Sequence, residues 1–365
     1  MINVSFFPSR RLALYMVRLF VTRSLAVLVA LVLILMTLDL LGESGKILAV
    51  PGNGDADLWR YVSYRLPMLT SRFLPFSVLL GTLIAFVGLN QNSEVTAMKA
   101  AGLSAHQILA PLVVASIGLA GLLFAFNEGV VVNSTRAVTA WSDNDYKPVP
   151  RASGTLSNVW IMSGDDLVRA KIAGGNPFVA HGVTIYDRGG GNLQRVIQAA
   201  RAVPQPGRGD WLLRDVTIYD ASMNAARTLP SMTAMEGITP DQLKLAKVDP
   251  TELNYWKLKK RIGELEIAGR PSDEARAGLA HKISQPLSIL LMPLLAGIAA
   301  FGLARSGQVL MRAVGGMAMG FAYFVVDNFS LAMGNAGTYP PLVAAWAPFF
   351  LFLLIGETVL IRTEE

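Results

Sequence analysis

Six long apolar runs constrain the fold of this chain more than any other feature of its sequence. They cover about residues 24–41, 66–89, 108–126, 283–304, 313–333 and 341–361. A helix needs about 20 mostly apolar residues to cross a bilayer. Only 16% of the 365 residues are charged, whereas a soluble domain usually carries about 25%. The sequence therefore predicts an α-helical membrane protein with six transmembrane helices, three before and three after a long polar segment.

The Lys and Arg residues of the short flanks predict the orientation. The side that holds the N-terminus would carry Arg10, Arg11, Arg18, Arg23, Lys99, Arg305, Arg312 and Arg362. The opposite short loops hold Lys46, Arg60 and Arg65, with Arg72 as a possible fourth cation. Because short cytoplasmic loops are enriched in Lys and Arg, we expect both termini in the cytoplasm and the polar segment in the periplasm or exterior. The first helix is expected to extend on its N-terminal side into RLALYMVRLFVTR.

The polar segment has the pattern of β structure. VTIYD occurs at 183–187 and again at 216–220, and each copy alternates apolar with Thr or Tyr side chains. RGGGN and PQPGRGD are typical turns between strands. An antiparallel sandwich or jelly roll of about 100 residues fits this spacing. We interpret the two VTIYD copies as chance similarity between two strands of one sheet, with a true duplication as the alternative.

A helix is expected after the strands, in DPTELNYWKLKKRIGELEIAGRP. Asp249 would be its N-cap and Pro250 its first residue, and Gly269 followed by Pro271 would end it. The predicted domains are residues 1–127 with three helices, 128–281 with the all-β jelly-roll-like part and the return helix, and 282–365 with three helices.

The sequence offers little for catalysis. GESGK (42–46) lacks the first Gly of a phosphate-binding loop, and Ile follows its Lys. Ser44 could serve an intramembrane serine hydrolase only with a His within hydrogen-bond reach, so a simple loop turn is the favoured interpretation. The chain has no Cys and three scattered His residues. We expect no metal site, no cofactor and no nucleic-acid partner.

One short segment, NQNSEVTAMKAAGLSAHQI (90–108), interrupts the apolar runs. Ser93 is expected to cap a helix that begins at Glu94 and ends at Gly102. Ser104 and Gln107 are spaced for a capping box at the next helix. Because Val95 and Met98 are expected to be exposed among small residues, the segment is predicted to be a docking surface for a cytoplasmic ATPase. The simpler alternative is that Glu94 only stabilises the helix dipole.

Acidic residues also occur inside or beside the apolar runs. Asp39 and Asp327 lie near the ends of their predicted helices, and Glu357 lies near the cytoplasmic end of the last one. A charge at a helix end can reach water at the interface, so simple solvation is the favoured interpretation for each. Their spacing does not suggest a proton relay.

Several segments of the chain resemble a known family. NSEVTAMKAAGLS resembles the coupling-helix segment of the LptF/LptG permeases of the lipopolysaccharide export ABC transporter. LPMLTSRFLPFSVLLGTLIAFVGL resembles the second helix of these permeases, and the expected 3 + β domain + 3 layout matches theirs. HKISQPLSILLMPLLA, FGLARS and GFAYFVVDNFSLAMG resemble the LptG branch more than the LptF branch.

The resemblance implies a subunit with no catalysis of its own. An LptF-type and an LptG-type permease would form a heterodimer in the bacterial inner membrane, driven by an LptB-type ATPase dimer and modulated by LptC. Lipopolysaccharide would be taken from the membrane and pushed onto a periplasmic bridge of β proteins. Glu94 matches the acid that meets the ATPase, and Met98, Lys99 and Gly102 would share the coupling surface.

One departure from the family concerns the lipid phosphates. LptG proteins can carry Lys within and just after the first helix, whereas LMTLDLL places Met36 and Leu38 around Asp39. The candidate lipid-phosphate contacts of this chain are Lys46, Arg60, Arg65 and Arg72. Two other functions stay open: an intramembrane serine hydrolase that uses Ser44, and a periplasmic anchor protein that moves no lipid.

Overall fold

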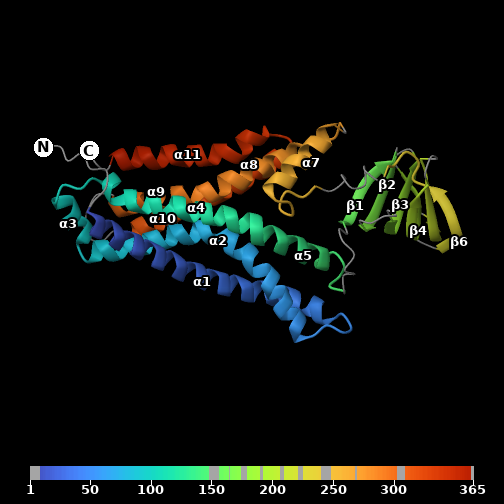
Figure 1. Cartoon of the computed structure of the whole chain (residues 1–365), viewed down its shortest axis with the longest axis horizontal. Helices are drawn as coiled ribbons and strands as arrows, with labels where there is room; N and C mark the ends of the chain where they lie inside the picture. The colour runs from blue at the N-terminus through green and yellow to red at the C-terminus, as the bar shows by residue number, and fades with distance from the viewer. Residues whose placement is uncertain are drawn as a thin grey trace. The chain divides into compact units, whose positions relative to one another are not determined.

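The chain folds into two compact units. The structure, a computed structural model, describes residues 9–147, 156–163, 165–173, 179–189, 192–205, 209–220, 225–239, 248–267, 269–301 and 309–362. The first unit comprises Met1–Gly45, Asp55–Thr135 and Pro250–Glu365 and is helical (Figure 1). The second unit comprises Lys46–Gly54 and Arg136–Asp249 and contains a β-sheet.

The described residues contain six helical segments that are apolar enough to span a membrane, which is the predicted number. The helices are α1 (Arg10–Leu48), α2 (Asp55–Gln91), α3 (Glu94–Ala100), α4 (Ala105–Phe126), α5 (Val132–Ser142), α7 (Tyr255–Ile267), α8 (Asp273–Leu287), α9 (Leu291–Phe301), α10 (Val309–Asn335) and α11 (Pro341–Arg362), with a π-helical turn η1 (Asn127–Val131) and a 3₁₀ turn η2 (Ser288–Leu290). Six helical segments within them are long and apolar enough to cross a membrane. The third of these runs on through η1 and α5 to Ser142.

Helix α1 is longer than the apolar run predicts. Its 39 residues would extend about 59 Å at 1.5 Å per residue. GESGK is therefore helical, and the expected loop turn at this position is wrong. Each Gly in a helix interior costs about 1 kcal/mol relative to Ala, but Ile47 beyond the glycines is fully buried and anchors the last turn.

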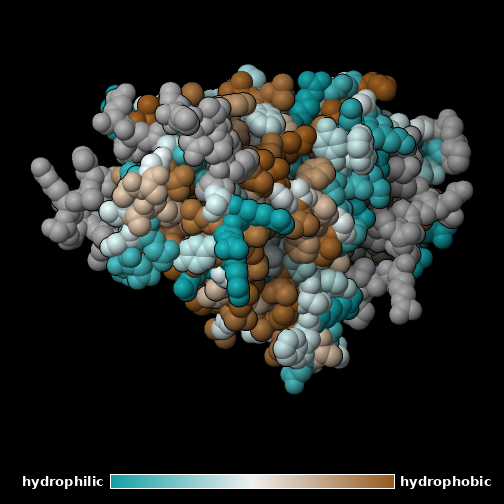
Figure 2. Space-filling view, turned by 60° about the vertical axis from the view of Figure 1, so that its left-hand side comes forward, coloured by the Kyte–Doolittle hydropathy of each residue, from teal (hydrophilic) through white to brown (hydrophobic). Residues whose placement is uncertain are grey.

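The core of the helical unit lies between α2, α4 and α9. Its fully buried side chains include Leu79, Ile108 and Leu295. Helix α1 crosses α2 closely at Gly81, where an added Cβ would lie 2.5 Å from the Ser24 Cα. Apolar side chains on α1, α10 and α11 stay exposed, and broad hydrophobic areas are visible on the surface (Figure 2). Such a surface suits contact with lipid or with another membrane helix.

The second unit holds a six-stranded antiparallel sheet. Its strands are β1 (Leu156–Ser163), β2 (Asp166–Ala173), β3 (Val179–Gly189), β4 (Asn192–Pro204), β5 (Trp211–Asp220) and β6 (Ala225–Ala234). Neighbours along the chain pair in the order β1-β2-β3-β4-β5-β6. The prediction of antiparallel strands is confirmed. The described strands form a simple meander, however, rather than the non-sequential pairing of a jelly roll.

The two VTIYD copies lie in one sheet, as interpreted from the sequence. They belong to β3 and β5 and flank β4 in the same register, because Ile197 pairs with Ile185 on one side and Ile218 on the other. Alternate residues of these strands are buried, which is the period-2 pattern of a sheet with one covered face. Trp211 is fully buried there, and its indole N–H donates to the Ile238 carbonyl at 2.7 Å.

The return helix α7 begins later than predicted. It starts at Tyr255, so the expected N-cap at Asp249 and first residue at Pro250 are wrong. Asn254 takes the capping role, because its side-chain oxygen accepts the Lys257 N–H at 3.0 Å. The predicted stop at Gly269 is confirmed: its φ is +66°, and the Arg270 N–H donates to the Leu265 carbonyl.

Candidate coupling site

The segment that joins α2 to α4 folds as a separate short helix. α3 begins at Glu94, as predicted, and a left-handed Gly102 with φ +83° ends it. The Leu103 N–H donates to the Met98 carbonyl and the Gly102 N–H to the Lys99 carbonyl, which is the Schellman arrangement. The predicted Ser104–Gln107 capping box is also confirmed. Ser93 differs from prediction: its φ is +57°, and its side chain makes no capping bond.

One face of α3 is packed into the helical unit. Val95 and Met98 lie three residues apart on that face, and they are 4% and 8% exposed. The expectation that both are exposed is wrong, because the face joins the same core cluster as Ala105 and Ile108. The opposite face presents Thr96, Ala97, Lys99, Ala100, Ala101 and Gly102 to solvent. A docking partner would therefore meet small side chains and one lysine, with Met98 beneath them.

Glu94 is bound to helix α1. The Tyr15 hydroxyl donates to its carboxylate, with oxygen distances of 3.0 and 3.3 Å. These residues are 79 positions apart, and no local pattern indicates their contact. An ionised carboxylate has about four acceptor positions, so Glu94 can accept from a further donor while Tyr15 stays bound. The bond fixes the first turn of α3 to the start of α1.

Two further contacts hold the surroundings of α3. The Lys99 ammonium lies 5.2 Å from the centre of the Phe301 ring, a cation–π distance. His106 on α4 and Glu357 on α11 approach to 3.2 Å between Nε2 and Oε2. Simple solvation is therefore not the whole account of Glu357. The segment around α3 is thus joined to α1, α9 and α11.

The other end of α1 is also tied to α2. The Asp39 carboxylate accepts two bonds from the Arg65 guanidinium, at 2.9 and 3.0 Å, and one from the Tyr61 hydroxyl at 2.7 Å. Simple interfacial solvation, the interpretation favoured for Asp39, is therefore wrong. A bidentate Arg–carboxylate pair fixes geometry as well as charge, so α1 is held near both of its ends.

The four candidate lipid-phosphate cations differ in their surroundings. Arg65 is engaged by Asp39, and the Arg60 guanidinium lies 5.8 Å from the Tyr64 ring centre. Lys46 is exposed and has an interaction of its own. Arg72 is exposed on α2, and no hydrogen bond or ion pair engages it within the part of the chain that the structure describes. The sequence pattern did not indicate which of these four cations has a partner within the chain.

A buried polar cluster lies where α4 passes through the π-helical turn. Lys282 and Glu128 form an ion pair at 3.1 Å, with only 13% and 18% of their side chains exposed. Glu128 also accepts the backbone N–H of Tyr255. Asn127 accepts from the Ser71 hydroxyl and donates to Gln285. π-helical turns often occur at functional positions, and this one joins α2, α7 and α8.

Asp327 is a second buried acid. It is 9% exposed on α10, and its carboxylate lies 3.9 Å from Nε2 of His281 on α8. The interpretation of a solvated residue at a helix end is therefore wrong for Asp327. A buried polar contact between two candidate spans restrains their relative movement, and intramembrane ionisable residues are commonly functional.

The hydrolase alternative gains no support from the surroundings of Ser44. Its hydroxyl donates to the Leu41 carbonyl at 3.3 Å, an ordinary contact within one helix. His106 contacts Glu357 and His281 contacts Ser284, so neither is placed as its base in the described residues. The geometry instead describes a multi-span membrane protein, with a separate short helix between two candidate spans and an antiparallel sheet domain.

Comparison with known proteins identifies the family to which this membrane protein belongs. The family profile "Lipopolysaccharide export system permease LptF/LptG" matches residues 14–362. The chain is 28% identical over 349 residues to lipopolysaccharide export system permease protein LptG of Escherichia coli K12, covering 93% of this chain and 94% of that protein. It is 26% identical over 325 residues to LptG of Haemophilus influenzae, covering 86% and 89%. The chain therefore belongs to the LptF/LptG permease family.

Proposed function

We propose that this chain is an LptG-type permease subunit of an ABC transporter. In this function it extracts lipopolysaccharide from the inner membrane and passes it to a periplasmic protein bridge. The observation that carries the proposal is a family match over residues 14–362 on a chain whose α3 presents Glu94 beside an exposed face of small residues. A separate cytoplasmic ATPase supplies the energy, and the chain itself catalyses nothing.

The proposed orientation places both termini and α3 in the cytoplasm, with residues 128–281 in the periplasm. The positive residues near the N-terminus and at Lys99 and Arg362 support this. Tags at Met1, Gly102 and Glu365 should react only from the cytoplasmic side, and a tag at Gly190 only from the periplasmic side. A cytoplasmic Gly190 would overturn the orientation and with it the transport direction.

Coupling to the ATPase is assigned to Glu94, Met98, Lys99 and Gly102. Glu94 offers its remaining acceptor positions to a cation on an LptB-type ATPase. Lys99 and the small exposed residues form the contact face, Met98 anchors α3 to the core, and Gly102 ends the helix. Because Tyr15 binds the same carboxylate, a displacement of α3 reaches α1 directly.

The exposed surfaces support further partners. The apolar face of α1, with Leu25, Val29 and Leu33 exposed, suits an LptF-type permease or the helix of LptC. β1 and β6 are the outer strands of the described sheet, and an open edge can accept a strand of LptC or of a bridge protein. Photocrosslinkers along β1 and β6 should trap such a partner, whereas β4 serves as the internal control. Capture at neither edge of either permease would end this assignment.

Lipid-phosphate binding is proposed for Lys46, Arg60, Arg65 and Arg72, with Arg72 as the first to test. Its cation is exposed on a candidate span and has no bound counter-charge in the described residues. Arg65 would have to exchange Asp39 for a phosphate. Arg72→Gln should therefore lower lipopolysaccharide crosslinking to the purified complex more than Arg65→Gln does. Equal crosslinking by wild type and both variants would remove these residues from the lipid path.

The overall function is tested by ATP-driven lipid release in proteoliposomes. The chain with its LptF-type, ATPase and LptC-type partners should release lipopolysaccharide to an added periplasmic bridge protein only when ATP is present. A Ser44→Ala variant should release as much as wild type, whereas the hydrolase hypothesis predicts its loss. Release without this chain would contradict the proposal and would favour the anchor protein.

A further inference from the structure

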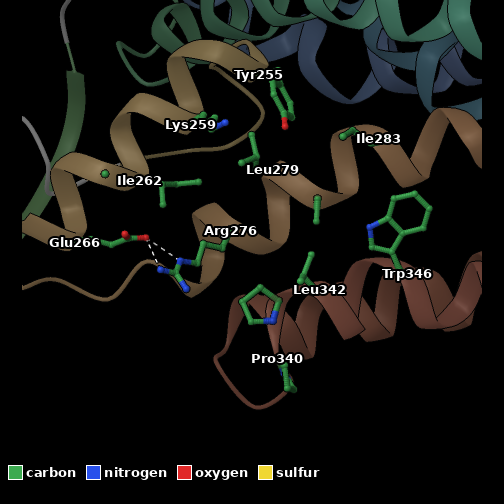
Figure 3. A pocket seen from close by; sticks show the side chains of 13 residues that line it. Tyr255, Lys259, Ile262, Glu266, Arg276, Leu279, Ile283, Pro340, Leu342 and Trp346 are labelled. Carbon is green, nitrogen blue, oxygen red and sulfur yellow. Dashed lines mark hydrogen bonds and ion pairs between the residues drawn. The ribbon is translucent and has the colours of Figure 1, made fainter.

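A pocket opens in the helical unit between α7, α8 and the start of α11. Its volume is about 610 Å³, within the range of about 300–1,000 Å³ for small-molecule sites. Most of its wall is apolar, contributed by Ile262, Leu279, Ile283, Leu342 and Trp346 (Figure 3). These side chains converge from three helices. The chemistry of the wall therefore selects a ligand with a substantial apolar part.

The charges of the pocket leave one cation uncompensated. Arg276 donates two hydrogen bonds, of 2.9 and 2.5 Å, to the Glu266 carboxylate (Figure 3). The charges of these two side chains therefore offset each other. Lys259 on α7 also lines the pocket. It is exposed and makes no ion pair or hydrogen bond within the described part of the chain. An apolar wall with one free ammonium is complementary to an amphiphile that carries one negative charge.

The position of the pocket indicates which class of amphiphile can reach it. It lies where the candidate spans Asp273–Gly297 and Pro341–Arg362 begin. Helix α7 beside it has Lys on its exposed side and a 74% exposed Trp256. Exposed Trp and Lys on an amphipathic helix are typical of the boundary between membrane and water. At that depth the anionic amphiphiles within reach are the lipids of the bilayer, and a phospholipid carries a single phosphate for the single free cation.

We propose that this pocket binds one anionic membrane phospholipid as a resident lipid. One acyl chain lies against Ile262, Leu279 and Trp346, and the headgroup phosphate is held by Lys259. The volume and the single free cation match one chain and one phosphate, whereas a lipid with several chains and phosphates would remain mostly outside. The lipid fills the space between α7 and the two spans. The site is separate from the coupling surface and from the four candidate lipid-phosphate cations. The proposed membrane orientation decides only which leaflet of the bilayer supplies the lipid.

The test uses the full complex in phosphatidylcholine nanodiscs that contain a trace of photoactivatable lipid. The acyl chain carries the reactive group, and the headgroup is either phosphatidylglycerol or phosphatidylcholine. Peptides from residues 255–283 should be labelled about threefold more by the anionic probe. Both headgroups carry the phosphate, but the choline ammonium of phosphatidylcholine offsets its charge and repels the exposed Lys259. Equal labelling by the two probes, or labelling no greater than that of lipid-exposed α10, would overturn the proposal.

Two variants and their matched controls sharpen the result. Lys259→Glu should remove the anionic preference, whereas Lys257→Glu, an exposed lysine of the same helix outside the pocket wall, should keep it. Gly263 lines the pocket, and an added Cβ meets nothing within 4 Å. Gly263→Phe should therefore fold and fill the pocket, and lower labelling by both probes. Gly118→Phe on α4 also has open space and should leave labelling unchanged.

Competition and transport assays separate this site from the proposed function. Added lipopolysaccharide should leave the labelling of 255–283 unchanged. If it displaces the probe more effectively than phosphatidylglycerol does, the pocket belongs to the exported lipid and the proposal is wrong. ATP-driven release is measured on the same nanodisc preparation after addition of the bridge protein. Loss of release with labelling intact would contradict the proposed function alone, and loss of the anionic preference with release intact would contradict this inference alone.

Discussion

The acidic side chains at the two ends of the helical unit differ in how fully they are paired. At the α3 end, Glu94 has one exposed hydrogen bond, to Tyr15, and its neighbours on the outer face are small. At the far end of α1, Asp39 is bound by both Arg65 and Tyr61, and Glu128 by Lys282 in a largely buried pair. The far end is satisfied internally, whereas the α3 end keeps acceptor capacity for another protein. We infer that the α3 end exchanges partners and the far end holds the spans in place.

The largest effect should come from breaking the buried pair at the far end. Glu128→Ala leaves the Lys282 ammonium without its partner, and loss of one member of a buried pair costs about 3–5 kcal/mol. Lys282→Ala should cost a similar amount. The double variant Glu128→Leu/Lys282→Met should lose less stability than either single change. Thermal unfolding of the detergent-solubilised complex measures all three. Additive losses would show that the two charges do not depend on each other.

A smaller effect should follow from cutting the anchor of α3. Met98→Ala removes a buried side chain, for which a loss of about 2–5 kcal/mol is typical in a core; the partial exposure of this short helix favours the lower end. We expect α3 to detach locally, so that hydrogen exchange of 94–100 accelerates while the rest of the unit stays protected. Ala97→Ser on the exposed face is the matched control. Unchanged exchange in Met98→Ala would mean that burial does not hold α3.

Sequence patterns predicted the local features of these two ends but not the contacts between segments that are distant in the chain. The start of α3 at Glu94, its end at Gly102 and the Ser104–Gln107 box follow from neighbouring residues. Which face of α3 is buried depends on helices elsewhere in the chain, so the exposure predicted for Met98 was wrong.

Long-range pairs explain most of the remaining differences. Glu128 and Lys282 are 154 residues apart, and no local spacing indicates their pairing. GESGK likewise looks like a loop from its local residues. The burial of Ile47, which accompanies the helical structure of this segment, is a tertiary effect that local residues do not indicate. The six spans and the antiparallel strands were predictable because hydrophobic run length and period-2 alternation are local. The sequential order of the strands was not, since turn signals alone do not fix which strands pair.

The smallest effect should come from Tyr15→Phe. This change removes one exposed hydrogen bond to Glu94 and keeps the ring, and exposed polar contacts contribute little to stability. Melting should be unchanged within error. If the bond transmits motion from α3 to α1, lipid release per ATP hydrolysed should fall, by less than about threefold. Ser44→Ala, which also removes a hydroxyl of α1, is the control. Identical coupling ratios for Tyr15→Phe and wild type would leave the bond without a transmitting role.

The central claim is that Glu94 keeps acceptor capacity for the ATPase, and copurified ATPase per permease tests it most directly. Loss of one member of an interface charge pair costs about 2–5 kcal/mol. Glu94→Ala and Glu94→Gln should therefore lower the amount of bound ATPase or its ATP-driven lipid release, and Glu94→Lys should lower both further through repulsion. The chain should still insert, and its sheet domain should stay folded in all three. If the three variants match wild type in both measurements, Glu94 serves only its own helix and the coupling site lies elsewhere.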